Sequence, residues 1–156
     1  MYKMDLATCR TLLAAANDWQ PAHIAPPAPQ RDWLLHAGSL TVKLREHGSV
    51  GVSIAHEGWN DGAPREWQRD VWLTVAGVRW IYAETRIPAD SHAALPLQQL
   101  GATPIGDWLY QQNPERLPLR WRHDPASGLY ARQSTLLIHG EPIHIAELFL
   151  PAFPWP

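Results

Sequence analysis

The sequence is poor in several features that mark common classes of protein. It has one cysteine, Cys9, so no disulfide can form within the chain. No apolar run reaches the roughly 18 residues that a membrane-spanning helix needs. The 13 basic and 15 acidic residues give a formal net charge of −2, without the basic excess typical of nucleic-acid or anionic-membrane binding. These absences favour a protein that binds a small molecule, with no nucleic-acid partner and no membrane insertion.

Motifs for metal, phosphate and covalent chemistry are lacking as well. The eight histidines form no HExxH pattern and no close grouping with Cys or Asp, so we expect no metal. Glycine-rich phosphate loops are absent, and "HGSVG" lacks the spacing of a nucleophile elbow. Cys9 has no predicted charged cluster beside it, which favours a core or partly exposed thiol over a nucleophile. The sequence therefore predicts a site without metal or cofactor.

Length and composition predict one domain over residues 1–156. With 46% hydrophobic residues, a chain of this length suits a single core. Charges at Lys3, Asp5 and Arg10 interrupt the apolar segment that a signal peptide needs, which predicts a cytoplasmic protein. A helical pattern at about 5–16 is followed by a connector at 21–30, and this segment is expected to pack on or flank the domain. Four prolines in the connector predict extended chain there.

The rest of the chain predicts an α+β fold with a sheet of about six mainly antiparallel strands. Ser39 can cap a short helix that Gly48 ends, and a helical stretch is expected at about 91–112, with Thr103 before Pro104 suiting a helix start. In the first strand Val50, Val52 and Ile54 share one face. A hairpin around Ala76 and Gly77 joins the next two strands. The expected strands are 49–59, 66–77, 78–88, 117–124, 129–140 and 143–151.

Two charged residues are predicted to point into the interior. Alternation along 66–75 places Arg69 on the face that is mostly apolar, and alternation along the last strand places Glu147 on a similar face. A buried charge is costly unless it is paired. Either Arg69 and Glu147 pair with each other, or Arg69 binds a ligand carboxylate with its planar fork while Glu147 meets a polar hydrogen nearby. The residues that share these faces are Trp67, Val71, Leu73 and Val75, and Ile143, Ile145 and Phe149.

Several motifs, in order, resemble one enzyme family. They are "WLLHAGSLT", "EGW", "RDVWL", "LGATPIGDWLY", "ARQSTL" and "ELFLPAFP", and the resemblance to chorismate pyruvate-lyases spans about residues 31–154. It implies an enzyme that converts chorismate to 4-hydroxybenzoate and pyruvate, the first committed step of ubiquinone biosynthesis. It also implies a monomer with a six-stranded antiparallel sheet, helices over one face, an enclosed site and no metal or cofactor.

The resemblance assigns roles to four residues. Arg69 is expected to hold the ring carboxylate and Glu147 to face the hydroxyl, while Leu40 and Ile105 offer backbone contacts to the ligand. The sequence leaves open whether Glu147 transfers a proton or only orients the hydroxyl. The family pattern also places an arginine where this chain has Glu84 in "AETRIP". Whether Arg86, two residues further on, replaces that arginine stays open.

Two other functions remain alternatives at this point. A similar enclosed α+β fold serves as the effector-binding part of some bacterial transcription regulators, so the chain could be a non-catalytic sensor. The segment before residue 30 is too short and too rich in proline for a helix-turn-helix, which weighs against that alternative. The other alternative is a lyase on the same fold that yields a different hydroxybenzoate.

Overall fold

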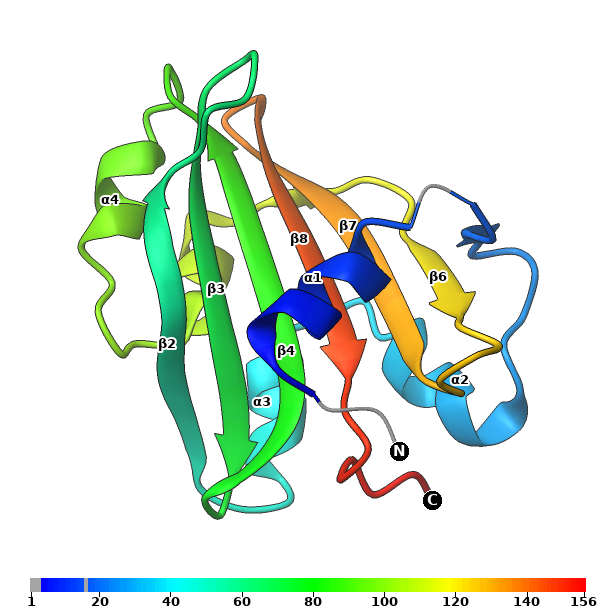
Figure 1. Ribbon diagram of the computed structural model, residues 1–156. Coiled ribbons are helices and arrows are strands. Elements are labelled where there is room, and N and C mark those ends of the chain that lie inside the picture. The colour runs from blue at the N-terminus through cyan, green and yellow to red at the C-terminus, as the bar shows by residue number, and fades with distance from the viewer. Residues whose placement is uncertain (1–3, 16) are drawn as a thin grey trace.

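An antiparallel sheet forms the framework of the molecule (Figure 1). The structure is a computed structural model and describes residues 4–15 and 17–156. In this part of the chain the sheet has eight strands, in the order β1-β6-β7-β8-β4-β3-β2, and β5 pairs with β7. The strands are β1 (Gln20–Pro21), β2 (Val50–Trp59), β3 (Glu66–Val75), β4 (Val78–Pro88), β5 (Glu115–Arg116), β6 (Arg120–His123), β7 (Tyr130–Ile138) and β8 (Glu141–Phe149).

The sheet confirms the α+β class and the six strands expected from alternation. The remaining two, β1 and β5, have two residues each, which is too short for a period of two to be visible in sequence. The hairpin between β3 and β4 turns at Ala76 and Gly77, whose φ angles are 49° and 81°. Positive φ at both central residues is the signature of the turn that matches the natural twist of a hairpin.

Helices lie on both faces of the sheet, whereas the resemblance implied helices over one face: α1 lies across one face and α3 lies against the other (Figure 1). The connector prediction was wrong beyond residue 27, because α2 starts inside it. Pro27 precedes the first helical residue and Pro29 lies in the first turn, where a missing N–H costs nothing. Among the described residues, no helix combines the length and apolarity needed to cross a lipid bilayer. The helices are α1 (Leu6–Leu13), α2 (Ala28–Leu34), α3 (Leu40–Arg45), α4 (Ala94–Gln98), α5 (Ile105–Leu109) and the 3-10 turn η1 (Tyr110–Gln112).

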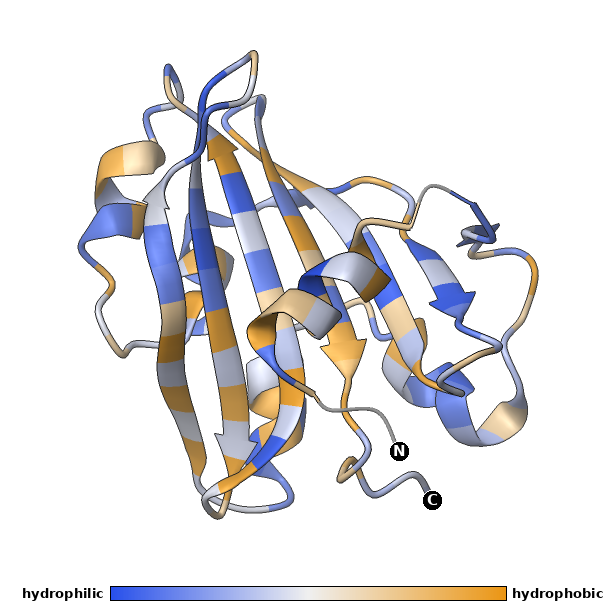
Figure 2. Ribbon diagram, viewed as in Figure 1, coloured by the Kyte–Doolittle hydropathy of each residue, from blue (hydrophilic) through white to orange (hydrophobic). Residues whose placement is uncertain are grey.

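Alternating side chains give the sheet two buried faces. Figure 2 shows hydrophobic and more polar residues alternating along β2, β3 and β4. On the face that α3 covers, Val71, Leu73 and Phe149 pack with residues of α2 and α3. On the opposite face, Trp72 and Tyr82 pack against α1. A single strand such as β3 therefore contributes side chains to both hydrophobic cores. Its charged residues are buried on both faces of the sheet and need partners there.

Helix α1 is fixed to the sheet by apolar packing and by one ion pair. Cys9 is fully buried in this cluster, and burial raises the pKa of its thiol to about 12, which agrees with a core thiol. Arg10 donates to Asp70 Oδ2 from Nη2 at 2.6 Å and from Nε at 3.1 Å. Asp70 has no exposed surface, so this contact supplies a counter-charge to a buried carboxylate that also accepts from Gln68 Nε2 at 3.0 Å.

A second carboxylate lies directly opposite Asp70. Glu84 on β4 is the register partner of Asp70 on β3, and like charges facing each other across a sheet are unfavourable. Burial, followed by the charge of Asp70, raises the pKa of Glu84 to about 7 from its ordinary 4.5. Its Oε2 is buried without a hydrogen-bond partner among the described residues. Glu84 is thus a source of pH-dependent instability on the face that α1 covers.

We predict that Glu84→Gln stabilises the protein more at pH 8 than at pH 5. A raised folded-state pKa means that folding favours the protonated acid, so the native protein loses stability as pH rises from about 4.5 through 7. Glutamine removes that loss, and the gain in melting temperature at pH 8 should be about 2–6 °C. Melting curves of both proteins at the two pH values check this. An equal gain at both would contradict a titrating Glu84.

Candidate functional site

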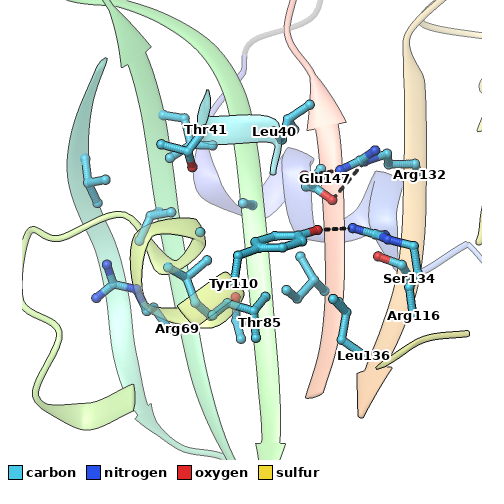
Figure 3. Close-up of a pocket in the computed structure, with 18 residues that line it drawn as sticks. Leu40, Thr41, Arg69, Thr85, Tyr110, Arg116, Arg132, Ser134, Leu136 and Glu147 are labelled. Carbon is cyan, nitrogen blue, oxygen red and sulfur yellow. Dashed lines mark hydrogen bonds and ion pairs between the residues drawn. The ribbon is translucent and has the colours of Figure 1, made fainter. Parts of the chain in front are cut away.

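A pocket lies between the sheet and the two short helices α3 and α5 (Figure 3). Strands β3, β4, β7 and β8 supply one wall, and the first residues of α3 and α5 supply the other. The structure brings together all four residues that the sequence singled out, because Arg69, Glu147, Leu40 and Ile105 all line this pocket. They come from four different elements, and alternation correctly turned both charged side chains inward.

Arg69 is 1% exposed and does not pair with Glu147. Figure 3 shows its guanidinium turned toward β2, away from Glu147. Nη1 donates to Glu57 Oε1 at 2.7 Å and to the carbonyl of Gly101 at 2.8 Å, and Nη2 donates to the carbonyl of Thr103 at 2.9 Å. One buried cation thereby links strand β2, strand β3 and the loop that leads into α5.

A β-bulge places Glu57 beside Arg69. Ile54 lies opposite Val71, but the register shifts between Ile54 and His56, so that Glu57 lies opposite Arg69. Strict alternation from Ile54 would have put His56 on that face. Bulges often redirect side chains next to functional sites. The same irregularity lies beside Ile54, which is 42% exposed.

Glu147 faces Arg132, a residue to which the sequence assigned no role. Arg132 Nε donates to Glu147 Oε1 at 3.1 Å and Nη2 donates to Oε2 at 3.2 Å (Figure 3). Arg132 and Glu147 are 2% and 5% exposed. Nη1 of Arg132 also donates to the carbonyls of Trp33 and His36 at 3.3 and 2.9 Å. The pair therefore closes the β7–β8 hairpin and holds the end of α2 against it.

The sequence did contain a signal for this pair. Arg132 and Glu147 are register partners in a hairpin whose turn lies at His139 and Gly140. Counting outward from that turn places the two residues directly opposite each other. A cross-strand pair of opposite charge is a common stabilising unit.

Helices α3 and α5 meet at a point where only glycine fits. A Cβ at Gly106 would lie 2.8 Å from both Ser39 Oγ and Thr41 Oγ1. The Ser39 side chain caps α3 by accepting from the Val42 backbone N–H at 3.3 Å, as the sequence predicted. A two-pronged ion pair between Arg45 and Asp107, with distances of 2.6 and 2.5 Å, joins the two helices further out. The pocket wall that carries Leu40 and Ile105 is thus one packed unit.

Neither Glu84 nor Arg86 reaches the pocket. Strand β4 presents Ala83 and Thr85 to the pocket. Because side chains alternate along a strand, Glu84 and Arg86 point to the opposite face of the sheet. Arg86 is exposed, with Nη1 3.9 Å from Glu66 Oε1. Position 84, where the family pattern has an arginine, and Arg86 thus share the face of β4 that is turned away from the pocket, so neither belongs to the pocket wall.

Tyr110 and Arg116 also line the pocket, and sequence reasoning missed both. Tyr110 donates from its hydroxyl to the Gly38 carbonyl at 3.1 Å, and Arg116 donates from Nη2 to that hydroxyl. Both lie just after α5, in a segment without a clear period. For metal ions, no group of three His, Cys, Asp or Glu side chains with suitable spacing occurs in residues 4–15 and 17–156. The chemistry available is that of arginines, one carboxylate and hydroxyl groups around an apolar cavity.

Solved structures define the class of fold. The effector domain of PhnF from Mycobacterium smegmatis superposes with a TM-score of 0.56 at 13% sequence identity, covering 81% of this chain and 92% of that one. A structure of PhnF from the same organism gives 0.57 at 14% identity, covering 75% and 65%. At such low identity the likeness concerns the fold alone. The chain thus shares the α+β fold of that PhnF domain.

Sequence comparison is more specific. The family model described as chorismate lyase matches residues 12–155. A probable chorismate pyruvate-lyase of Pasteurella multocida is 35% identical over 150 residues, which cover 85% of this chain and 87% of that protein. The chorismate pyruvate-lyase of Escherichia coli strain K12 is 33% identical over 139 residues, covering 79% and 83%. The chain belongs to the chorismate lyase family, and the expected resemblance is confirmed.

We predict that Arg132→Met destabilises the ligand-free protein by about 3–5 kcal/mol, because it leaves the Glu147 carboxylate buried without its partner. The double variant Arg132→Met/Glu147→Leu should recover most of that loss, since no charge is then stranded. Urea denaturation measures both. Arg120→Met, at an exposed position on β6, is the control and should change stability by less than about 0.5 kcal/mol. A small effect of Arg132→Met would show that the pair is not structural.

Proposed function

We propose that this protein converts chorismate to 4-hydroxybenzoate and pyruvate, the first committed step of ubiquinone biosynthesis. The observation that carries the proposal is the convergence of Arg69, Glu147, Leu40 and Ile105 on one pocket. Membership of the chorismate lyase family, over residues 12–155, supports it. Relatives named chorismate pyruvate-lyase, at 33–35% identity over most of the chain, support it as well.

The reaction needs positioning more than reactive groups. Breaking the ring ether bond and removing one ring hydrogen turns the ring aromatic, so aromatisation supplies the driving force. The protein has to hold the enolpyruvyl side chain in a reactive pose over the ring and keep water away. A pocket with apolar walls from β3, β7, β8 and α5 and a few fixed polar groups suits that task.

Arg69 is the proposed anchor for the ring carboxylate. Its guanidinium has five N–H donors, and Glu57, Gly101 and Thr103 engage three of them. Two donors remain, as many as a bidentate grip on a carboxylate requires. The same contacts fix the guanidinium in place before the ligand arrives, which reduces the entropy lost on binding.

Glu147 is the proposed partner of the ring hydroxyl. Each of its oxygens accepts one hydrogen bond from Arg132, and a carboxylate oxygen has room for a second. An ionised carboxylate beside a fixed guanidinium can accept the hydroxyl proton in a hydrogen bond and so orient the ring. The backbones of Leu40 and Ile105 would bound the ligand from the helix side. Full enclosure of the site, a monomeric state and a cytoplasmic location stay predictions.

A second candidate is a binding domain without catalysis. The observation that favours it is the fold shared with the PhnF effector domain. Such a protein would need the same anchors for an aromatic acid. Binding alone therefore does not separate the two functions, whereas turnover does.

We predict that the purified protein releases equimolar 4-hydroxybenzoate and pyruvate from chorismate, in excess over enzyme. Chromatography of timed samples measures both products. Binding without product would favour the effector-domain alternative, and a different isomer would favour the other lyase. Neither product nor binding would contradict the proposal altogether.

We predict that Arg69→Lys weakens 4-hydroxybenzoate binding by about 2–4 kcal/mol, because lysine keeps the charge but loses the planar fork. The melting temperature should also fall, since the carbonyls of Gly101 and Thr103 lose their fixed donors. Calorimetric titration at a temperature where the variant is folded separates the two effects. The control is Arg120→Lys at the exposed position on β6. Normal product affinity in a destabilised Arg69→Lys would leave Arg69 with a structural role only.

A further inference from the structure

The arginines that line the pocket differ in whether a carboxylate balances their charge. Arg69 has Glu57 at 2.7 Å, and Arg132 has Glu147 at 3.1 Å. Arg116 donates from Nε to the Ala37 carbonyl at 3.1 Å and from Nη2 to the Tyr110 hydroxyl, both of which are neutral. Among the described residues, Arg116 is the pocket-lining arginine without a carboxylate in its hydrogen-bond set.

One donor of Arg116 is buried and unused. Its Nη1 has no hydrogen-bond partner within the described part of the chain. The other side chains with such atoms are Trp67, Tyr82, Glu84 and Arg122, and none of them lines the pocket. A buried donor without a partner costs free energy, more so when it is charged. An anion that reached this nitrogen would remove that cost.

The register of the sheet turns Arg116 toward the cavity. Arg116 on β5 lies opposite Leu136 on β7, and Leu136 and Ser134 point into the pocket (Figure 3). The same figure shows the Arg116 guanidinium against the Tyr110 hydroxyl. Because that hydroxyl donates its own hydrogen to Gly38, it presents a lone pair to Arg116. Tyr110 therefore fixes the direction of the guanidinium.

The field around Arg116 is positive. Burial, then the charges of Lys43, Arg132 and Arg116, lower the pKa of His36, so this histidine is neutral near pH 7. The pocket-lining charges, taken with Glu57, are three arginines against two carboxylates. One net positive charge remains, and it belongs to Arg116.

We propose that Arg116, positioned by Tyr110, binds the second carboxylate of a dianionic ligand, the one on the enolpyruvyl side chain of chorismate. The inference rests on the proposed function, under which Arg69 takes the ring carboxylate. It divides the two carboxylates between arginines on separate strands, β3 and β5. The substrate then makes both contacts, whereas 4-hydroxybenzoate, which has only the ring carboxylate, makes one.

The test compares substrate and product on the same variants. Arg116→Gln should raise KM for chorismate about 10- to 100-fold, the range expected for a charged hydrogen bond, and leave the inhibition constant of 4-hydroxybenzoate within about twofold of wild type. Arg116→Lys should keep part of the chorismate affinity, because the charge stays while the fork is lost. Tyr110→Phe should raise KM for chorismate a few-fold, again without effect on 4-hydroxybenzoate. Arg120→Gln, at the exposed position on β6, is the matched control.

Each outcome decides the assignment. An unchanged KM in Arg116→Gln overturns it, and so does an equal loss for chorismate and 4-hydroxybenzoate, which would mark a general effect on the pocket. Melting curves show whether Arg116→Gln folds. If it does not, Arg116→Lys is compared with wild type instead. A wild-type KM for chorismate in Arg116→Lys, or an equal loss of affinity for chorismate and 4-hydroxybenzoate, then overturns the assignment. If the wild type binds chorismate without turnover, the proposed function fails while calorimetric affinities for the two ligands still test Arg116. Absence of chorismate binding overturns both.

Discussion

A buried guanidinium must find a counter-charge and acceptors for its donors, and this constraint arranges the elements around the pocket. Arg69 and Arg132 meet it in the same way, each with a glutamate on the neighbouring strand and two backbone carbonyls from outside the sheet. Glu57 and Glu147 are the direct register partners of their arginines. The carbonyls that Arg69 contacts belong to Gly101 and Thr103, in the loop before α5. Those that Arg132 contacts belong to Trp33 in α2 and to His36 between α2 and α3.

This duplication explains how a small domain can keep polar groups ready inside an apolar cavity. Desolvating an ion is costly, and a pair recovers that cost only with good geometry and further hydrogen bonds. Both arginines have these, so their contribution is to fix strand, loop and helix relative to one another. Arg116 differs because its acceptors are neutral. Arg69 and Arg132 thus hold structural elements together as well as lining the site, while the charge of Arg116 remains available to a ligand.

Much of the fold, and part of the site, could be predicted from sequence. Alternation located six strands and turned Arg69 and Glu147 inward, because a period of two is strict wherever the sheet is regular. The bulge after Ile54 has no such signature, and it alone decides that Glu57, not His56, faces Arg69. The two-residue strand β5, which carries Arg116, is too short to show a pattern. Sequence periodicity thus found the residues on long strands and missed those whose placement depends on an irregularity or on tertiary pairing.

The adjacent residues Arg69 and Asp70 show why opposite charges next to each other in sequence do not cancel here. Strand alternation sends Arg69 to the pocket and Asp70 to the face beneath α1, and each is buried against its own partner. On the α1 face Asp70 and Glu84 oppose each other, with Arg10 paired to the former and the charge of Arg86 acting on the latter. On the pocket face the excess charge is positive. The sheet therefore separates two electrostatic environments: the titration of Glu84 near neutral pH acts on the face that carries α1, whereas the pocket face has three arginines and two carboxylates.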